Sequence, residues 1–309
     1  MPATTSERLA EAPVTAADDA CLVCGGTRFL AHFRGAAPLP AAGTPPQPYR
    51  ITHSQRERVR AVLRCETCGL VFLPRVLVQV GAYHEGADPY YAEQAEERIA
   101  NAHRLLALVP AGGRLLDVGC ACGFLLVAAR ERGFEVQGLE ASRWASEYAR
   151  REYGLDVRTA ALEDVDGPTA SYDVAVLADV IEHFTDPRAA VRRLHTLLSQ
   201  GGRLLILTPD IGSVVARIAG ARWWGLLDDH YFYFSRATLR RLLESEGFTV
   251  ERFTALGRSF PLRHWIFKLS QYSDGLQRLA MGLARGIGAD AWQISFNFLD
   301  QMACVAVKK

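Results

Sequence analysis

Four of the seven cysteines occur in two pairs that have the spacing of metal ligands. Each pair is a C-x-x-C turn followed by glycine, and the four residues are Cys21, Cys24, Cys65 and Cys68. Thiolates on two such turns can bind one Zn²⁺ tetrahedrally, because glycine permits the tight turn that directs backbone amides towards sulfur. A closed site of four thiolates has no position open for a substrate, so we expect structural zinc. Redox chemistry at either pair is the alternative.

A second candidate site is the stretch LLDVGCACGF at residues 115–124, where an apolar strand runs into a turn that contains Gly119 and Gly123. A turn of small residues lets a ligand approach the backbone and a helix N-terminus. Glu140 ends the next predicted strand, and a carboxylate there can accept hydrogen bonds from both hydroxyls of a ribose. The two features together predict a ligand that contains adenosine.

Two other uses of this turn are less favoured. The dinucleotide fingerprint G-x-G-x-x-G, started at Gly119, would need glycine where Ala121 and Phe124 stand, so nicotinamide chemistry is disfavoured. Cys120 and Cys122 are one residue apart, which would point their thiols to different sides. We therefore interpret the turn as a cofactor loop and assign the metal to the other four cysteines.

Strand-like and helix-like segments alternate along the chain and would position this turn. Apolar runs at 113–118, 134–139, 172–178 and 202–208 are separated by amphipathic segments, and two further runs follow at 248–254 and 300–309. Local signals mark helix ends: Ser142 and Asp186 as N-caps, Pro187 in a first turn and Gly154 after a last turn. The pattern predicts an α/β fold with a doubly wound, mainly parallel sheet.

The bulk properties limit the function classes. A chain of 309 residues with 49% hydrophobic content can bury one large core and a small satellite module. The net charge is +1, so no global field would attract nucleic acid or an anionic membrane. We see no signal peptide and no apolar run long enough for a membrane span, and we expect a cytoplasmic protein.

The segmentation we expect has three parts. Residues 1–18 form a disordered tail, 19–82 a zinc-ribbon-like module with a Pro-rich loop, and 83–309 the catalytic domain. That domain would carry helical insertions at about 211–230 and 258–293.

The cofactor turn resembles the first motif, D-x-G-C-G-x-G-x, of class I S-adenosylmethionine-dependent methyltransferases. Asp117, Gly119, Cys120, Gly123 and Phe124 match it, and Ala121 departs by one methyl group. YDVAVLADVIEHFTDP, GGRLLILTPD and WWGLLDDHYFYFSRATLRRLLESEGF resemble later regions of the branch that includes ubiquinone-type methyltransferases. The cysteine quartet resembles the zinc module of a bacterial subgroup that includes sugar C-methyltransferases.

This resemblance implies a seven-stranded sheet whose last strand is antiparallel, and a set of cofactor contacts. The turn around Gly119 would pack against the methionine part, Asp117 would help to hold its amino group, and Glu140 would take the ribose hydroxyls. Relatives often recognise adenine with an aspartate that would align with Ala161. The substitutes here are the backbone of Leu162 and the side chain of Glu163, and Asp179 would border the sulfonium. Each role has a simpler alternative. Gly119 and Gly123 could merely form a tight turn, Glu140 could be a solvated strand end and Asp179 could be a helix cap.

The candidates for a general base are His183 and His230, each beside carboxylates, although either histidine can instead hold backbone groups in place. Several aromatic residues could line the acceptor pocket or pack in the core: Tyr90, Tyr91, Trp223, Trp224, Tyr231 and Tyr233. The basic, aromatic segment 258–285 could be a lid, a homodimer contact or a surface for an anionic or lipid-like substrate. If alkylation blocks activity and the cofactor protects against it, we expect Cys122, with its thiol towards the methionine end, to be the residue that reacts.

The sequence therefore predicts a biosynthetic enzyme that transfers a methyl group from S-adenosylmethionine to a small-molecule acceptor, such as a natural product or a sugar. A non-catalytic binding module with the same fold is the alternative, and a nicotinamide-dependent oxidoreductase is a more distant one.

Overall fold

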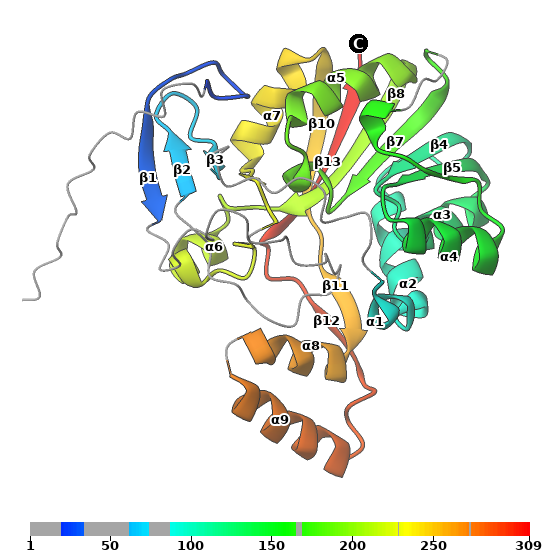
Figure 1. Ribbon diagram of the computed structural model, residues 1–309, viewed down its shortest axis with the longest axis vertical. Helices are drawn as coiled ribbons and strands as arrows, with labels where there is room; N and C mark the ends of the chain where they lie inside the picture. Colours follow the sequence, from blue (N-terminus) through cyan, green and yellow to red (C-terminus); the bar gives the residue numbers. More distant parts are fainter. Residues whose placement is uncertain (1–19, 34–61, 74–86, 165–168, 228, 272) are drawn as a thin grey trace, which may run out of the picture.

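The computed structural model describes residues 20–33, 62–73, 87–164, 169–227, 229–271 and 273–309 (Figure 1). The tail expected at 1–18 and the Pro-rich loop of the N-terminal module lie outside these residues.

A seven-stranded sheet forms the centre of the molecule. Its spatial order is β10 (Phe248–Ala255), β13 (Gln301–Lys308), β8 (Leu198–Pro209), β7 (Tyr172–Ala178), β4 (Gly113–Val118), β5 (Phe134–Glu140) and β6 (Val157–Thr159). The last strand, β13, runs antiparallel to both of its neighbours, whereas β6, β5, β4, β7 and β8 pair in parallel. The predicted seven-stranded, mainly parallel sheet with an antiparallel last strand is confirmed.

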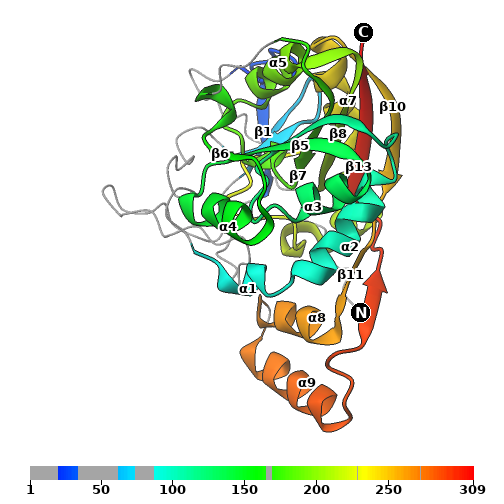
Figure 2. The same cartoon turned by 90° about the vertical axis from the view of Figure 1, so that its right-hand side faces the viewer.

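Helices cover both faces of this sheet (Figure 2). One face carries α2 (Ala95–Leu106), α3 (Phe124–Glu131) and α4 (Arg143–Tyr153), and the other carries α5 (Pro187–Leu197) and α7 (Arg236–Ser245). Successive side chains of each strand enter opposite cores: Leu115 packs with α2 and α3, and Leu116 packs with α5 and α7. Alternation of this kind explains why the strands are apolar at nearly every position.

The predicted helix caps form. The Ser142 hydroxyl accepts a hydrogen bond from the Ala145 amide at 3.3 Å, and the Asp186 carboxylate accepts one from the Ala189 amide at 2.9 Å. Pro187 occupies the first turn of α5, and Gly154 ends α4 in the left-handed conformation. These local signals fix the ends of helices that flank the carboxyl edge of the sheet.

A second, antiparallel sheet contains β1 (Phe29–Phe33), β2 (Val62–Cys65), β3 (Val71–Phe72) and β9 (Phe232–Tyr233), in that order. Its first three strands belong to the cysteine-bearing segment, but β9 comes from far along the chain, with Val71 opposite Tyr233. The N-terminal segment is therefore joined to the rest of the molecule by backbone hydrogen bonds.

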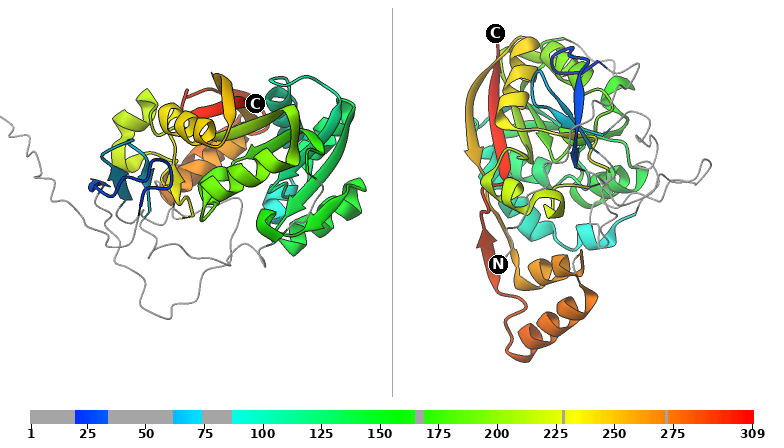
Figure 3. Two further views of the ribbon diagram at one scale, coloured as in Figure 1. Left: turned by 90° about the horizontal axis from the view of Figure 1, so that it is seen from above. Right: turned by 90° about the vertical axis from the view of Figure 1, so that its left-hand side faces the viewer.

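The insertion after β10 extends away from the sheet as a lobe (Figures 1 and 3). It consists of β11 (Arg258–Pro261), α8 (Leu262–Lys268), the 3-10 helix η5 (Leu269–Gln271), α9 (Asp274–Gly286) and β12 (Gln293–Phe296). The helices α8, η5 and α9 lie within the segment 258–293 where a helical insertion is expected, and the pairing of β11 with β12 closes the lobe.

The remaining short elements are α1 (Pro89–Ala92), the 3-10 helices η2 (Leu162–Asp164), η3 (Ile181–His183) and η4 (Gly220–Arg222), and α6 (Val214–Ala219). In the part of the chain that the structure describes, no helix has the length and apolar character needed to cross a membrane.

Candidate functional site

A cavity of about 880 Å³ opens at the carboxyl ends of the parallel strands. Gly119 follows β4, Glu140 ends β5, Asp179 follows β7 and Pro209 ends β8, and all four line the cavity. In open α/β sheets, ligands bind at this edge. The fold thus places most of the predicted site around one space.

The neighbours of Gly119 and Gly123 in the β4 turn leave no room for a side chain. A Cβ on Gly119 would lie 2.6 Å from Val180 Cγ2, and one on Gly123 would lie 2.5 Å from Leu155 Cδ1. Both glycines also have positive φ angles, +72° and +80°. The turn therefore depends on residues without side chains.

Ala121, where the resembling motif has glycine, also adopts a left-handed conformation, with φ of +46°. Such a conformation costs an L-residue about 1 kcal/mol. The Ala121 amide donates a hydrogen bond of 2.8 Å to Glu140 Oε2, and the Ser142 amide donates one of 2.7 Å to Oε1. Glu140 thereby holds the turns after β4 and β5 together at the cavity wall.

The predicted site residues fall into two groups. Those that line the cavity are Gly119, Glu140, Leu162, Glu163, Asp179, His183 and His230. Those that lie behind its wall are Asp117, Cys120, Gly123 and Phe124, and all four are buried. Asp117 has an exposed fraction of 2%, and its desolvation, followed by the charge of Glu140, raises its pKa well above the ordinary value. These four residues shape the turn from behind.

The interpretation of Cys122 as an alkylation-sensitive thiol at the cofactor is wrong. Its side chain is fully buried in a cluster with Phe124 and Ala145. Burial, followed by the charge of Glu140, raises the pKa of its thiol to about 12. A buried, protonated thiol is a poor nucleophile.

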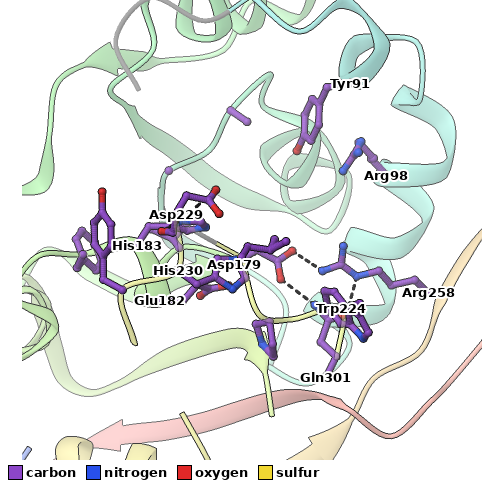
Figure 4. Close-up of a pocket in the computed structure, with 18 of the residues that line it drawn as sticks. Tyr91, Arg98, Asp179, Glu182, His183, Trp224, Asp229, His230, Arg258 and Gln301 are labelled. Carbon is purple, nitrogen blue, oxygen red and sulfur yellow. Dashed lines mark hydrogen bonds and ion pairs between the residues drawn. The ribbon is translucent and has the colours of Figure 1, made fainter. Parts of the chain in front are cut away.

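Asp179, Arg258 and Gln301 are each hydrogen-bonded to the other two, an arrangement that the sequence did not reveal (Figure 4). Its carboxylate accepts hydrogen bonds from Arg258 and, at 2.8 Å, from the Gln301 amide. Arg258 Nε also donates to Gln301 Oε1 at 2.6 Å. Asp179 has φ of +57°, a strained conformation typical of functional sites.

A second polar cluster contains Glu182, His183, Asp229 and His230 (Figure 4). His183 Nδ1 lies 2.7 Å from the Asp229 carbonyl oxygen, and His230 Nδ1 lies 2.9 Å from that of Gly225. Because a carbonyl can only accept, both Nδ1 atoms carry protons, and in each neutral ring the lone pair is on Nε2. The two rings meet edge to face with centroids 4.8 Å apart.

Burial controls the charge state of this cluster. Desolvation, followed by the electrostatic influence of the neighbouring His183, lowers the pKa of His230 to about 4. Desolvation, followed by Asp179, raises the pKa of the Glu182 carboxyl well above its usual range. Thr208 donates to Glu182 Oε2 at 3.0 Å, whereas Oε1 is buried and has no hydrogen-bond partner among the described residues. One ligand atom each from Glu182, His183 and His230 lie within 4.8 Å of one another, so the cluster could also hold a metal ion.

The lowered pKa of His230 predicts loss of stability in acid. Between the ordinary value of 6.5 and about 4, the unfolded chain binds a proton at this site and the folded chain does not. Folding stability contributed by the site is therefore lost as the pH falls from about 6.5 towards 4. Relative to pH 7, we expect the loss at pH 5 to be about 2 kcal/mol.

Urea unfolding at pH 7 and pH 5 checks this expectation by comparison of the wild type with His230→Asn, whose amide can still donate to Gly225. The variant should lose about 2 kcal/mol less between the two pH values, because it lacks the titrating ring. Equal losses in the two proteins would show that His230 is not held neutral by the fold.

Aromatic residues form much of the remaining wall. Trp223 and Trp224 line the cavity, and both indole N–H groups donate to Asp300 Oδ2. Tyr231 also lines it, whereas the Tyr233 hydroxyl donates to the Leu227 carbonyl at 2.8 Å. In α1, Tyr91 lines the cavity and Tyr90 stacks near Phe267, with ring centroids 5.0 Å apart.

The four cysteines of the N-terminal segment converge. Cys21 Sγ lies 3.6 Å from Cys68 Sγ, Cys24 Sγ lies 3.5 Å from Cys65 Sγ, and all four sulfurs lie within 4.8 Å of one another. A tetrahedral Zn²⁺ with Zn–S bonds of 2.3 Å needs sulfurs about 3.8 Å apart. The set therefore fits zinc.

Hydrogen bonds connect this cysteine centre to the histidine cluster. The Arg188 guanidinium on α5 donates to the carbonyls of Leu22 and Val23 at 2.7 and 3.0 Å. The Leu73 amide donates to Tyr231 O, and the Tyr231 amide donates to Glu182 O, each at 2.8 Å. Tyr231, the residue after His230, is thus held by the N-terminal module through its carbonyl and by η3 through its amide.

Sequence patterns missed Arg98, Asp300 and Gln301 as cavity residues, and they indicated Arg258, His264 and Lys268 only as members of the basic, aromatic segment 258–285. A weak signal existed for Asp300 and Gln301, which are polar and directly precede the apolar run of β13. Arg98 lies on α2, and its type and position in the sequence give no signal that its side chain faces the cavity.

Comparisons with known proteins agree with the fold. A family model described as "Methyltransferase domain" matches residues 91–252. The ubiquinone biosynthesis O-methyltransferase of Idiomarina loihiensis is 35% identical over 103 residues, which are 31% of this chain and 42% of that protein. The enzyme of the same name from Aeromonas salmonicida is 29% identical over 152 residues, 45% of this chain and 64% of that protein. The chain spans about half the length of the curated relatives it matches.

Among solved structures, a chain from the complex between the Haloferax volcanii Trm112 methyltransferase activator and a methyltransferase superposes with a TM-score of 0.52. It is 18% identical, and the match covers 71% of this chain and 94% of that one. At this identity the likeness shows the shared fold.

Proposed function

Because the chain belongs to the methyltransferase domain family, we propose that it transfers a methyl group from S-adenosylmethionine to a small-molecule acceptor. The observation that carries the proposal is the shared cavity: the β4 turn with Glu140 and the Glu182–His183–His230 cluster line one space. The residues proposed to bind the nucleoside and the groups able to accept a proton therefore line the same cavity.

Glu140 is the residue we assign to the ribose hydroxyls. Its carboxylate lines the cavity at the end of β5, and a carboxylate on that strand can accept hydrogen bonds from both hydroxyls of a ribose. The walls at Leu162 and Glu163 would take the adenine, and Gly119, with the adjacent backbone, would pack against the methionine part. Asp179, held by Arg258 and Gln301, would border the sulfonium with its negative charge.

When bound, S-adenosylmethionine supplies an activated methyl group, and its transfer is an in-line displacement that depends chiefly on positioning. The bond from acceptor to methyl forms as the bond from sulfur to methyl breaks, and the acceptor proton must leave. We assign that proton to Nε2 of His183 or His230, since both rings are held with Nδ1 protonated. Asp229, with Oδ2 3.8 Å from His183 Nδ1, would stabilise the resulting cation.

The acceptor we propose carries a hydroxyl group and belongs to a biosynthetic pathway. Support comes from the two relatives named ubiquinone biosynthesis O-methyltransferases, whose similarity covers 31% and 45% of this chain. We assign a structural zinc ion to the four cysteines, because four thiolates would fill a tetrahedral site and leave no position for a substrate.

Calorimetric titration tests the cofactor assignment. We expect S-adenosylhomocysteine to bind at one site per chain in the micromolar range or tighter, and NAD⁺ to show no heat of binding under the same conditions. Binding of NAD⁺ in preference to S-adenosylhomocysteine would favour the oxidoreductase. Binding of neither would favour a non-catalytic module.

A further inference from the structure

A further histidine, besides His183 and His230, lines the cavity from the lobe. His264 lies in α8, and its ring stacks on Phe260 with centroids 4.1 Å apart and an interplanar angle of 18°. Trp265 meets the same ring edge to face at 5.7 Å. These contacts fix the plane of the imidazole. Neither the cofactor contacts nor the proton transfer proposed above involves it.

Hydrogen bonds around Gln94 determine which nitrogen of His264 carries the proton. Arg98 Nη2 lies 2.8 Å from Gln94 Oε1, and because a guanidinium can only donate, the amide atom that faces it must be the oxygen. The amide nitrogen of Gln94 then faces His264 Nδ1 at 3.1 Å. Since this NH₂ group can only donate, Nδ1 holds a lone pair and the proton of the neutral ring is on Nε2.

The surroundings of His264 keep its ring uncharged. The residue has an exposed fraction of 6%, and desolvation, followed by the charges of Lys268 and Arg98, lowers the pKa of the ring to about 3. Among the described residues, Nε2 has no hydrogen-bond partner. The ring therefore offers a neutral N–H donor whose partner must come from outside the described chain.

We propose that His264 selects the acceptor by donating a hydrogen bond from Nε2 to an oxygen other than the methylated hydroxyl, such as a carbonyl or ether oxygen. This inference rests on the proposed function, in which His183 or His230 receives the hydroxyl proton. Those two rings donate to backbone carbonyls through Nδ1 and leave Nε2 with a lone pair, whereas His264 accepts through Nδ1. The cavity therefore suits a molecule with a hydroxyl at one position and a hydrogen-bond-accepting oxygen at another.

Nitrogen NMR of protein labelled with ¹⁵N-histidine tests the tautomer. The His264 signal is identified by its absence in His264→Phe, and we expect Nε2 to carry its proton. Gln94→Glu should move the proton to Nδ1, because a carboxylate can accept from both Arg98 and His264. Gln277→Glu makes the same change on α9 and should have no effect. A proton on Nδ1 in the wild type, or an unchanged tautomer in Gln94→Glu, would overturn the proposal.

A pair of probes tests the donor role in protein saturated with S-adenosylhomocysteine. 4-Hydroxyacetophenone and 4-isopropylphenol have the same arrangement of heavy atoms and the same phenolic hydroxyl, but only the first has a carbonyl oxygen. The proton on His264 Nε2 should shift with the first probe and not with the second. The ratio of the two affinities should fall about fivefold in His264→Phe, which corresponds to the loss of one hydrogen bond. Phenylalanine keeps an aromatic ring at this position, so 4-isopropylphenol affinity should stay within about twofold.

The cofactor is the other source of an oxygen, and the same measurements separate it from the acceptor. A shift of the Nε2 proton on addition of S-adenosylhomocysteine alone, with about a tenfold loss of its affinity in His264→Phe, would assign the donor to the cofactor and overturn the proposal. The same ratio of probe affinities in the wild type and His264→Phe would leave His264 with a packing role only. Absence of S-adenosylhomocysteine binding in the wild type would instead contradict the proposed function.

Discussion

Replacement of Glu140 by glutamine is expected to weaken binding of S-adenosylhomocysteine about 100-fold. The carboxylate accepts hydrogen bonds from the Ala121 and Ser142 amides, and glutamine would turn one acceptor into a donor that faces an amide. A hydrogen bond to a charged group contributes about 1.5–3 kcal/mol, so loss of one ribose contact and one loop contact corresponds to roughly two orders of magnitude. Calorimetry of the variant and the wild type measures the change.

Glu147→Gln provides the matched control, because Glu147 lies exposed on α4 and the substitution removes the same charge. Its affinity should equal that of the wild type. Thermal unfolding of Glu140→Gln establishes that the variant remains folded at the assay temperature. If Glu140→Gln folds and binds as the wild type does, the ribose assignment is incorrect.

The parts of this molecule that could be predicted are those whose signals are local. The strands at 113–118 and 172–178 have the predicted bounds, since buried parallel strands need uninterrupted apolar residues. The helix starts at Ser142 and Asp186 follow from side chains that cap their own helices. Glycine in the β4 turn and the acidic end of β5 follow in the same way from short-range geometry.

The parts that could not be predicted depend on contacts between distant residues. Arg258 meets Asp179, 79 residues away, and β11 pairs with β12 across an entire helical lobe. No local property of Phe232 and Tyr233 indicates that they add a strand to the N-terminal sheet. Cys122 shows the converse error: its position in the cofactor turn was correct, but the direction of its side chain depends on packing with Phe124.

Because β3 pairs with β9, removal of the proposed zinc is expected to have a large effect beyond the N-terminal segment. Cys65→Ser replaces a fully buried cysteine of the four-cysteine set. Structural zinc contributes about 10–16 kcal/mol of apparent binding free energy in small zinc domains, so the variant should lose its metal and the β1–β3 sheet should unfold. Because β3 would no longer pair with β9, the Leu73 bond to Tyr231 would also be lost.

Three measurements check the outcome. Zinc content should fall from about one per chain to near zero, and hydrogen exchange should accelerate in residues 229–235 as well as in β2 and β3. S-adenosylhomocysteine affinity should change little, as Glu140 and the β4 turn are held by bonds within the large sheet. Cys304→Ala, at a buried cysteine of β13 outside the four-cysteine set, should retain both zinc and the slow exchange. Retained protection of residues 229–235 in metal-free Cys65→Ser would show that β9 holds the histidine cluster without the N-terminal module.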